Sequence, residues 1–136
     1  MKLTTLESSV LEMLLAGPEP ELATLRAQAG SAQAADRWLS GVGFYTKFAF
    51  PSEPVPLPGH PTFDFGDVNA KSPQLAFGAG FVLFVRGGVL YALEGYTYDD
   101  PWPTDEASIT LGYKGGMHKR DTILQLIRGA GTATRR

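Results

Sequence analysis

The fold is decided by one stretch of the chain, Phe81-Val82-Leu83-Phe84-Val85-Arg86-Gly87-Gly88-Val89-Leu90-Tyr91-Ala92-Leu93-Glu94. It contains two runs of apolar, β-branched and aromatic residues, which are typical of strands. The glycine pair between them suits a two-residue hairpin turn, because such a turn needs positive φ at its central positions. The stretch therefore predicts a β-hairpin in which Arg86 lies opposite Val89.

Regular pairing from Arg86 and Val89 assigns every other residue of the hairpin to a face. One face then carries Val85 with Leu90, Leu83 with Ala92 and Phe81 with Glu94, and the other carries Phe84 with Tyr91 and Val82 with Leu93. Both faces are apolar, whereas a sheet with one face in water alternates apolar and polar residues. The hairpin is therefore expected to be covered on both faces or to use one of them as an interface.

The N-terminal part, residues 1–40, is expected to be helical. Thr4 and Glu7 have the spacing of a capping box, and Gly17-Pro18 is a typical helix end. A second, alanine-rich helical segment is expected from Pro20 to Leu39, with a break near Gly30 as an alternative. These features predict two N-terminal helices.

The middle of the chain, residues 41–113, is expected to form a sheet around the 81–94 hairpin. Aromatic residues alternate over 42–50, a proline-rich loop spans 51–61, and further strands are expected over 63–68 and 107–113. Residues 114–136 form a basic C-terminal segment, in which 121–128 suits either a short helix or a strand. The prediction is one α+β domain with two N-terminal helices packed on a mostly antiparallel sheet.

Composition excludes several classes of function. The chain has 136 residues, no cysteine and a formal net charge of −2. Thiol nucleophiles and thiolate metal sites are thereby excluded, and no overall positive charge attracts nucleic acid or an anionic membrane. Neither an export signal nor a membrane-spanning stretch is recognisable, so we expect a cytoplasmic protein without nucleic-acid or membrane partners.

Glu94 is the first candidate site residue. Regular pairing places its carboxylate on an apolar face near the open end of the hairpin, where burial would perturb its pKa, and perturbed carboxylates cluster at functional sites. The structural alternative is that Glu94 lies just beyond the covered part of the sheet or pairs with Lys47, Arg86 or Arg37. That alternative is favoured, because structural ion pairs give the same pattern.

The second candidate is the loop 94–103, which concentrates aromatic, acidic and proline residues. Its candidate binding residues are Glu94, Tyr96, Tyr98, Asp99, Asp100 and Trp102. Tyrosine and tryptophan give rigid contact area, and proline limits the entropy lost on binding. The alternative is structural: Trp102 and the tyrosines close the core, and Asp99-Asp100-Pro101 forms a turn. The turn is favoured for the two aspartates.

Other sites have weaker support. Asp99, Asp100, Asp105 and Glu106 have oxygen ligands for a hard cation, but their spacing matches no known calcium loop, so no metal is expected. His60 and His118 are expected to be ordinary surface residues. The pair Gly78 and Gly80 precedes a strand rather than a helix, which suits a bulge or a close backbone approach and not a dinucleotide site. No cofactor is expected.

Two stretches carry a resemblance. GVGFYT at residues 41–46 and GAGFVLF at 78–84, continuing to LEGYTYDDPWP at 93–103, resemble motifs of a group of short bacterial proteins. The resemblance covers most of the chain after residue 40 and implies a bacterial source. The group has no established activity, so the resemblance assigns no catalytic residue.

Three functional hypotheses follow, and only the second includes an enzyme. The first is a protein-binding module of the immunity or accessory type that uses loop 94–103. The second is a small-ligand binder or hydrolase in which Glu94 is paired with Asp99 or Asp100, and it predicts a pocket at the open end of the hairpin. The third is a homodimer formed through one apolar sheet face.

Overall fold

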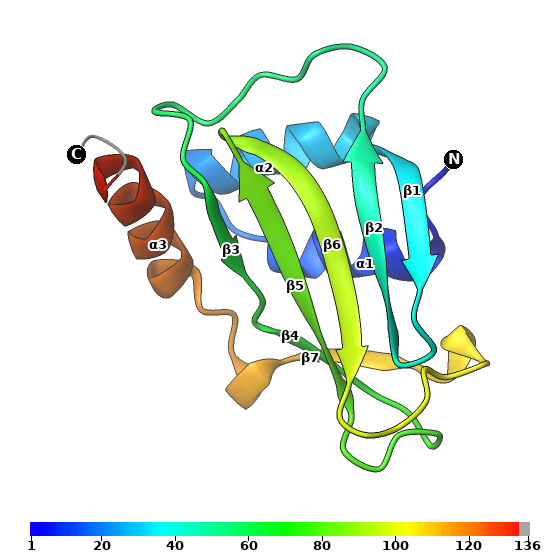
Figure 1. The fold of residues 1–136 in the computed structure, drawn as a ribbon. Coiled ribbons are helices and arrows are strands. Elements are labelled where there is room, and N and C mark those ends of the chain that lie inside the picture. Colours follow the sequence, from blue (N-terminus) through cyan, green and yellow to red (C-terminus); the bar gives the residue numbers. More distant parts are fainter. Residues whose placement is uncertain (134–136) are drawn as a thin grey trace.

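The computed structural model describes residues 1–133 as an α+β fold (Figure 1). Its helices are α1 (Thr5–Leu14), α2 (Pro20–Ser31) and α3 (Arg120–Ala133). Its strands are β1 (Gln33–Leu39), β2 (Gly43–Ala49), β3 (Phe63–Phe65), β4 (Val68–Lys71), β5 (Ala79–Arg86), β6 (Val89–Thr97) and β7 (Thr110–Tyr113). Short 3-10 turns lie at Glu106–Ser108 and Lys114–Gly116.

The strands form one antiparallel sheet in the order β1-β2-β6-β5-β4-β7, and β3 also pairs with β5. The predicted α+β class, with two N-terminal helices and a sheet centred on the 81–94 hairpin, is confirmed. Residues 121–128 are helical, within α3. None of the helices described over residues 1–133 is both long enough and apolar enough to cross a membrane.

The predicted helical extent of residues 1–40 is wrong at its end. Helix α2 stops at Ser31, just after Gly30, and residues 33–39 form β1 instead. Strand β1 pairs with β2, so Ala34 lies opposite Phe48 and Trp38 opposite Tyr45. The helix signal was weak after Gly30, and pairing with a neighbouring strand outweighed local helix propensity.

The hairpin turn is confirmed, but its predicted register is not. Gly87 and Gly88 both have positive φ, and Arg86 lies opposite Val89. A bulge then inserts Tyr91 between the pairs Val85–Leu90 and Phe84–Ala92. Beyond the bulge Leu93 pairs with Leu83, and Glu94 pairs with Val82 rather than Phe81.

The bulge has a clear physical reason. Strand β6 keeps both Leu90 and Leu93 in the core, where regular alternation would have placed Ala92 and Glu94. It thereby directs Leu93 rather than Ala92 toward the helices and leaves the Glu94 carboxylate on the opposite face. Leaving an unpaired carboxylate outside the core avoids a desolvation penalty.

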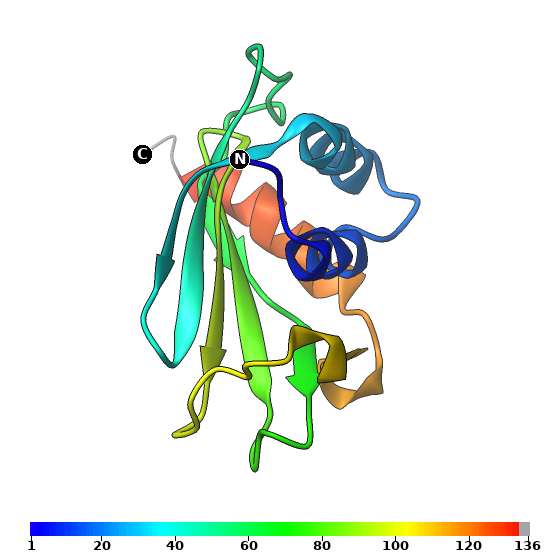
Figure 2. The ribbon, with the colours of Figure 1, turned by 90° about the vertical axis from the view of Figure 1, so that its right-hand side faces the viewer.

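All three helices lie on the same side of the sheet (Figure 2). Helix α2 contacts β6, α3 contacts β3, and α1 contacts both α2 and β4. The core between helices and sheet includes Val10, Leu14, Leu22, Leu25, Ile123 and Ile127 from the helices and Phe44, Phe48, Phe81, Leu83, Val85 and Leu93 from the strands. Among residues 1–133, no helix lies on the opposite face of the sheet (Figure 2).

Helix α2 is tied to the hairpin by a buried glutamine. The Gln28 carboxamide donates to the carbonyl oxygens of Val55 (2.8 Å) and Gly88 (3.0 Å), and its Oε1 accepts from the Leu90 amide (2.8 Å). One side chain thus holds the proline-rich loop, the hairpin turn and the start of β6 together.

Candidate protein-binding surface

The side of the sheet away from the helices carries a surface that we call the uncovered face. Alternation along the strands defines it, since Phe44, Thr46 and Phe48 of β2 and Phe81, Leu83 and Val85 of β5 are buried on the helix side. Its members include Asp36, Trp38, Tyr45, Lys47, Asp64, Val82, Phe84, Arg86, Tyr91 and Glu94.

A row of aromatic rings crosses the uncovered face. The Trp38 and Tyr45 ring centroids are 5.8 Å apart, and those of Tyr45 and Phe84 are 6.0 Å apart. The row therefore connects β1, β2 and β5. Trp38 is 52% exposed, while Tyr45 and Phe84 are half-buried. Aromatic rings at these distances attract one another, which fixes their positions while part of their apolar surface remains exposed to water.

Charges of both signs border the aromatic row. The ammonium group of Lys47 lies 5.4 Å, and the guanidinium group of Arg86 3.8 Å, from the centroid of the Tyr91 ring. Such cation–π contacts hold the two cations over the face. Glu94 lies opposite both Tyr45 and Val82, in the middle of the sheet. The suggested pairing of Glu94 with Arg37 does not occur, because Arg37 binds Glu7 on the other face.

Tyr96 and Tyr98 extend this surface toward the end of β6. Their rings meet edge to face at 5.6 Å. The Tyr96 ring lies over Gly80, where a Cβ atom would come within 2.6 Å of the ring, so this glycine makes room for a side chain. The expected close backbone approach occurs at Gly78, where a Cβ atom would lie 2.8 Å from the Ala70 carbonyl oxygen. Hydrogen bonding to Tyr96, then burial, raises the pKa of Tyr98. Tyr98 therefore stays a neutral phenol well above pH 7.

The other candidates of loop 94–103 have structural roles. Asp99 adopts positive φ in the turn, and Oδ2 of Asp100 accepts the Ala76 amide at 2.8 Å. The Trp102 ring packs edge-on against Phe44 at 5.3 Å, and its Nε1 donates to Glu106 at 2.9 Å. The structure thus brings Glu94, Tyr96 and Tyr98 toward one surface, and separates Asp99, Asp100 and Trp102 from it.

This division predicts different effects of substitution within the loop. Trp102→Ala should lower the free energy of unfolding by about 2 kcal/mol, less than a fully buried tryptophan because the side chain is partly exposed. Tyr98→Ala should change it by less than about 0.5 kcal/mol, as is usual for surface substitutions. Urea unfolding of both variants measures the difference. Equal losses would contradict the division.

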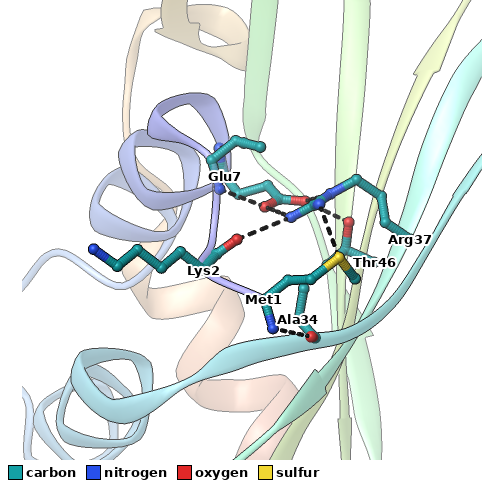
Figure 3. A network of polar contacts seen from close by, with 7 residues as sticks. Met1, Lys2, Glu7, Ala34, Arg37 and Thr46 are labelled. Atoms are coloured by element: carbon teal, nitrogen blue, oxygen red, sulfur yellow. Dashed lines mark hydrogen bonds and ion pairs between the residues drawn. The ribbon is translucent and has the colours of Figure 1, made fainter.

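Glu7 is a buried carboxylate on the helix side of the sheet, and the sequence predicted only some of its contacts. The predicted capping box of Thr4 and Glu7 is confirmed. Arg37 of β1 also binds Glu7 through two nitrogens, Nε to Oε2 at 2.9 Å and Nη2 to Oε1 at 2.6 Å, and the Thr46 hydroxyl donates to Oε2 (Figure 3). Burial favours a raised pKa for Glu7, but these hydrogen bonds outweigh it and lower the pKa. Every oxygen of the carboxylate is occupied, which suits structure rather than catalysis.

The expectation of a surface His118 is wrong. Its side chain is only 11% exposed. Nδ1 lies 2.7 Å from Oδ2 of Asp67, Nε2 lies 2.8 Å from the Ala16 carbonyl oxygen, and the ring stacks on Tyr113. Because both ring nitrogens are occupied, His118 links the α1–α2 turn to the sheet. His60 is exposed in the proline-rich loop, as expected.

The acidic residues after β6 form no common site. Asp105 caps the 3-10 turn at Glu106–Ser108, and Glu106 binds Trp102. Within residues 1–133, no three or more histidine or carboxylate side chains are grouped so that they would hold a metal ion. The acids instead stabilise turns of the loop.

Comparisons with protein-family models, with curated proteins and with solved structures found no match to this chain. The resemblance of its motifs to a group of short bacterial proteins therefore stays a prediction.

Proposed function

We propose that this chain is a protein-binding module of the immunity or accessory type, which binds its partner through the uncovered face and its continuation at Tyr96 and Tyr98. One observation carries the proposal: the helices cover a single face of the sheet, while the other face presents the aromatic row of Trp38, Tyr45 and Phe84. Exposed aromatic patches bordered by polar groups are typical of protein interfaces.

The charges on the uncovered face favour a protein partner over nucleic acid. Lys47 and Arg86 lie at one end of the face, but Glu94 lies in its middle, and Asp36 and Asp64 lie opposite Lys47 and Phe84 on the neighbouring strands. Nucleic acid would be repelled by these carboxylates. A partner that presents apolar side chains, an acidic group toward Lys47 and Arg86, and a basic group toward Glu94 is complementary to this face.

The hydrolase alternative has less support. Glu94 lies on the uncovered face, whereas the Asp100 carboxylate is held by the Ala76 amide and Asp99 occupies a turn. Paired carboxylates need a common pocket with room for substrate and water. None of these three side chains lines the cavity at the open end of the hairpin.

We further propose that the module acts in a bacterial cytoplasm. The resemblance of the motifs to short bacterial proteins and the absence of cysteine support this, since an oxidising compartment favours disulfides. Expression of the chain with a fluorescent tag in its source organism, followed by cell fractionation, tests the location.

Site-specific cross-linking tests the binding proposal. A photoreactive phenylalanine analogue is placed at Tyr45 or Trp38, and at the exposed Leu126 of α3 as a control, in cells that produce the protein. We expect a discrete cross-linked protein from the first two positions only. Phe84→Ser, combined with Tyr45→Ser, should weaken binding of that protein at least 30-fold, because even one central aromatic anchor contributes about 2 kcal/mol or more.

Matched controls keep the outcomes separate. Val55→Ser with Leu126→Ser removes two exposed apolar side chains elsewhere and should leave binding unchanged. If cross-links form only between two copies of the chain, and light scattering gives twice the monomer mass, the partner is a second copy of the chain and not a different protein. Equal cross-linking from Leu126 and Tyr45 would overturn the proposal.

A further inference from the structure

A second surface feature lies at the open end of the hairpin, beside Tyr98. A cavity of about 580 Å³ is formed there by the end of β4, the loop that follows it and the start of β5. Its volume is within the range of small-molecule sites, roughly 300–1,000 Å³. The side chains that matter for its chemistry are Asn69, Lys71, Ser72, Phe77, Tyr98 and Lys114. A pocket at this position was predicted from the sequence, although with carboxylates in it.

The lining of this cavity is positive, although the chain as a whole is negative. Lys71 and Lys114 both line it, and no carboxylate does. Neither lysine forms an ion pair with an acidic residue among residues 1–133. The carboxylate of Asp100 contacts the main chain of Ala76 at the edge of the cavity and is occupied by that contact. An anion would therefore meet two ammonium groups that lack a negative partner.

The donor groups around Lys114 are held in place by aromatic neighbours. Nζ of Lys114 lies 3.3 Å from the Tyr96 hydroxyl and 5.9 Å from the centroid of that ring. Tyr96 in turn contacts Tyr98, and the hydrogen bond to Tyr96 raises the pKa of Tyr98. Lys114 and Tyr98 thus present an ammonium group and a phenol to the same cavity.

The rim of the cavity has an apolar component. Phe77 lines it and is 71% exposed, whereas most of the other phenylalanines of the chain are buried. Leu75, beneath it, is buried. An aromatic or aliphatic group entering the cavity would cover the Phe77 ring and gain contact area.

We propose that this cavity binds a small organic anion, whose carboxylate or phosphate group lies between the ammonium groups of Lys71 and Lys114 and whose apolar part lies against Phe77. The two ammonium groups donate to the anionic oxygens. Charge-assisted hydrogen bonds of this kind are stronger than neutral ones. The anion site adjoins the proposed protein-binding surface at Tyr98, but its charged contacts, Lys71 and Lys114, and its apolar contact, Phe77, lie outside the uncovered face.

Nuclear magnetic resonance titration tests the inference with four probes. Phenyl phosphate and benzoate carry both the anion and the ring, inorganic phosphate carries the anion alone, and benzyl alcohol carries the ring alone. We expect saturable amide shifts at Lys71, Phe77 and Gly78 with the first two probes. Their dissociation constants should be on the order of 1 mM, as suits fragments of this size. The tighter of the two identifies the preferred anionic group.

Paired variants locate the charge. Lys71→Gln with Lys114→Gln should weaken phenyl phosphate at least tenfold, because a hydrogen bond to a charged group is worth roughly that factor. Lys47→Gln with Arg86→Gln removes two cations from the uncovered face and should leave the affinity unchanged. Benzyl alcohol binding as tightly as phenyl phosphate, equal affinity in the two paired variants, or an absence of saturable shifts would each overturn the inference.

Discussion

Glu7→Ala is expected to lower the free energy of unfolding by about 3 kcal/mol, the lower end of the range for breaking a buried ion pair. The substitution leaves Arg37 without its carboxylate and removes the acceptor of the Thr46 hydroxyl. Arg37 is 20% exposed, so water recovers part of its solvation and keeps the loss near that lower end. Urea unfolding of the purified protein measures the effect.

The same pair predicts a dependence on pH. Because the folded state lowers the pKa of Glu7 below its ordinary value of 4.5, the carboxylate stabilises the fold fully above that pH. The contribution declines as the pH falls from 4.5 through the lowered pKa, and it is absent below that. The stability difference between wild type and Glu7→Gln should follow this course. A stability difference that stays constant as the pH falls from 7 to well below 4.5 would contradict the assignment.

Gln28→Leu is expected to cost about 3 kcal/mol, because a buried group without its hydrogen-bond partner costs about 1–3 kcal/mol, and one buried and one part-buried group lose their partner. The Leu90 amide loses its acceptor and the Val55 carbonyl loses its donor, whereas the Gly88 carbonyl keeps the Leu57 amide. Leucine has nearly the same volume, so the loss measures hydrogen bonds rather than packing.

Denaturant unfolding gives the total effect of Gln28→Leu, and hydrogen exchange gives its location. Exchange at the Leu90 amide should accelerate more than exchange in the middle of β5. Gln125→Leu makes the same change at an exposed position of α3 and should be close to neutral. A loss below about 1 kcal/mol for Gln28→Leu would show that water replaces the glutamine.

The parts of the fold that were predicted from sequence depend on neighbours in the chain. The capping box of Thr4 and Glu7 and the glycine turn at 87–88 are local patterns, and both are present. Strand β1 was not predicted, because its identity depends on pairing with β2 rather than on its own alanine-rich sequence. The contacts of Glu7 with Arg37 and of Gln28 with Leu90 span 30 and 62 residues, and no periodicity indicates them.

The candidate site was predicted only in part, because some of its features depend on contacts between residues that are distant in the sequence. The residue types showed that both faces of the hairpin are apolar, and one of these two faces forms part of the uncovered face. The position of Glu94 required the bulge at Tyr91, which a regular alternation of residues cannot indicate. For Trp102 the sequence left two roles open, and its contacts with Phe44 and Phe81 decide for closure of the core.

The bulge in β6 also has a consequence for how this chain tolerates changes of length. Relative to β5, strand β6 already contains one additional residue at Tyr91. Deleting Tyr91 would restore regular alternation while keeping Leu90 and Leu93 inside and Glu94 outside, whereas deleting Phe84 from β5 would exchange the two faces of its strand. Single-residue deletions should therefore be accepted in one strand of the hairpin and rejected in the other, and homologues of different length are expected to differ at this position.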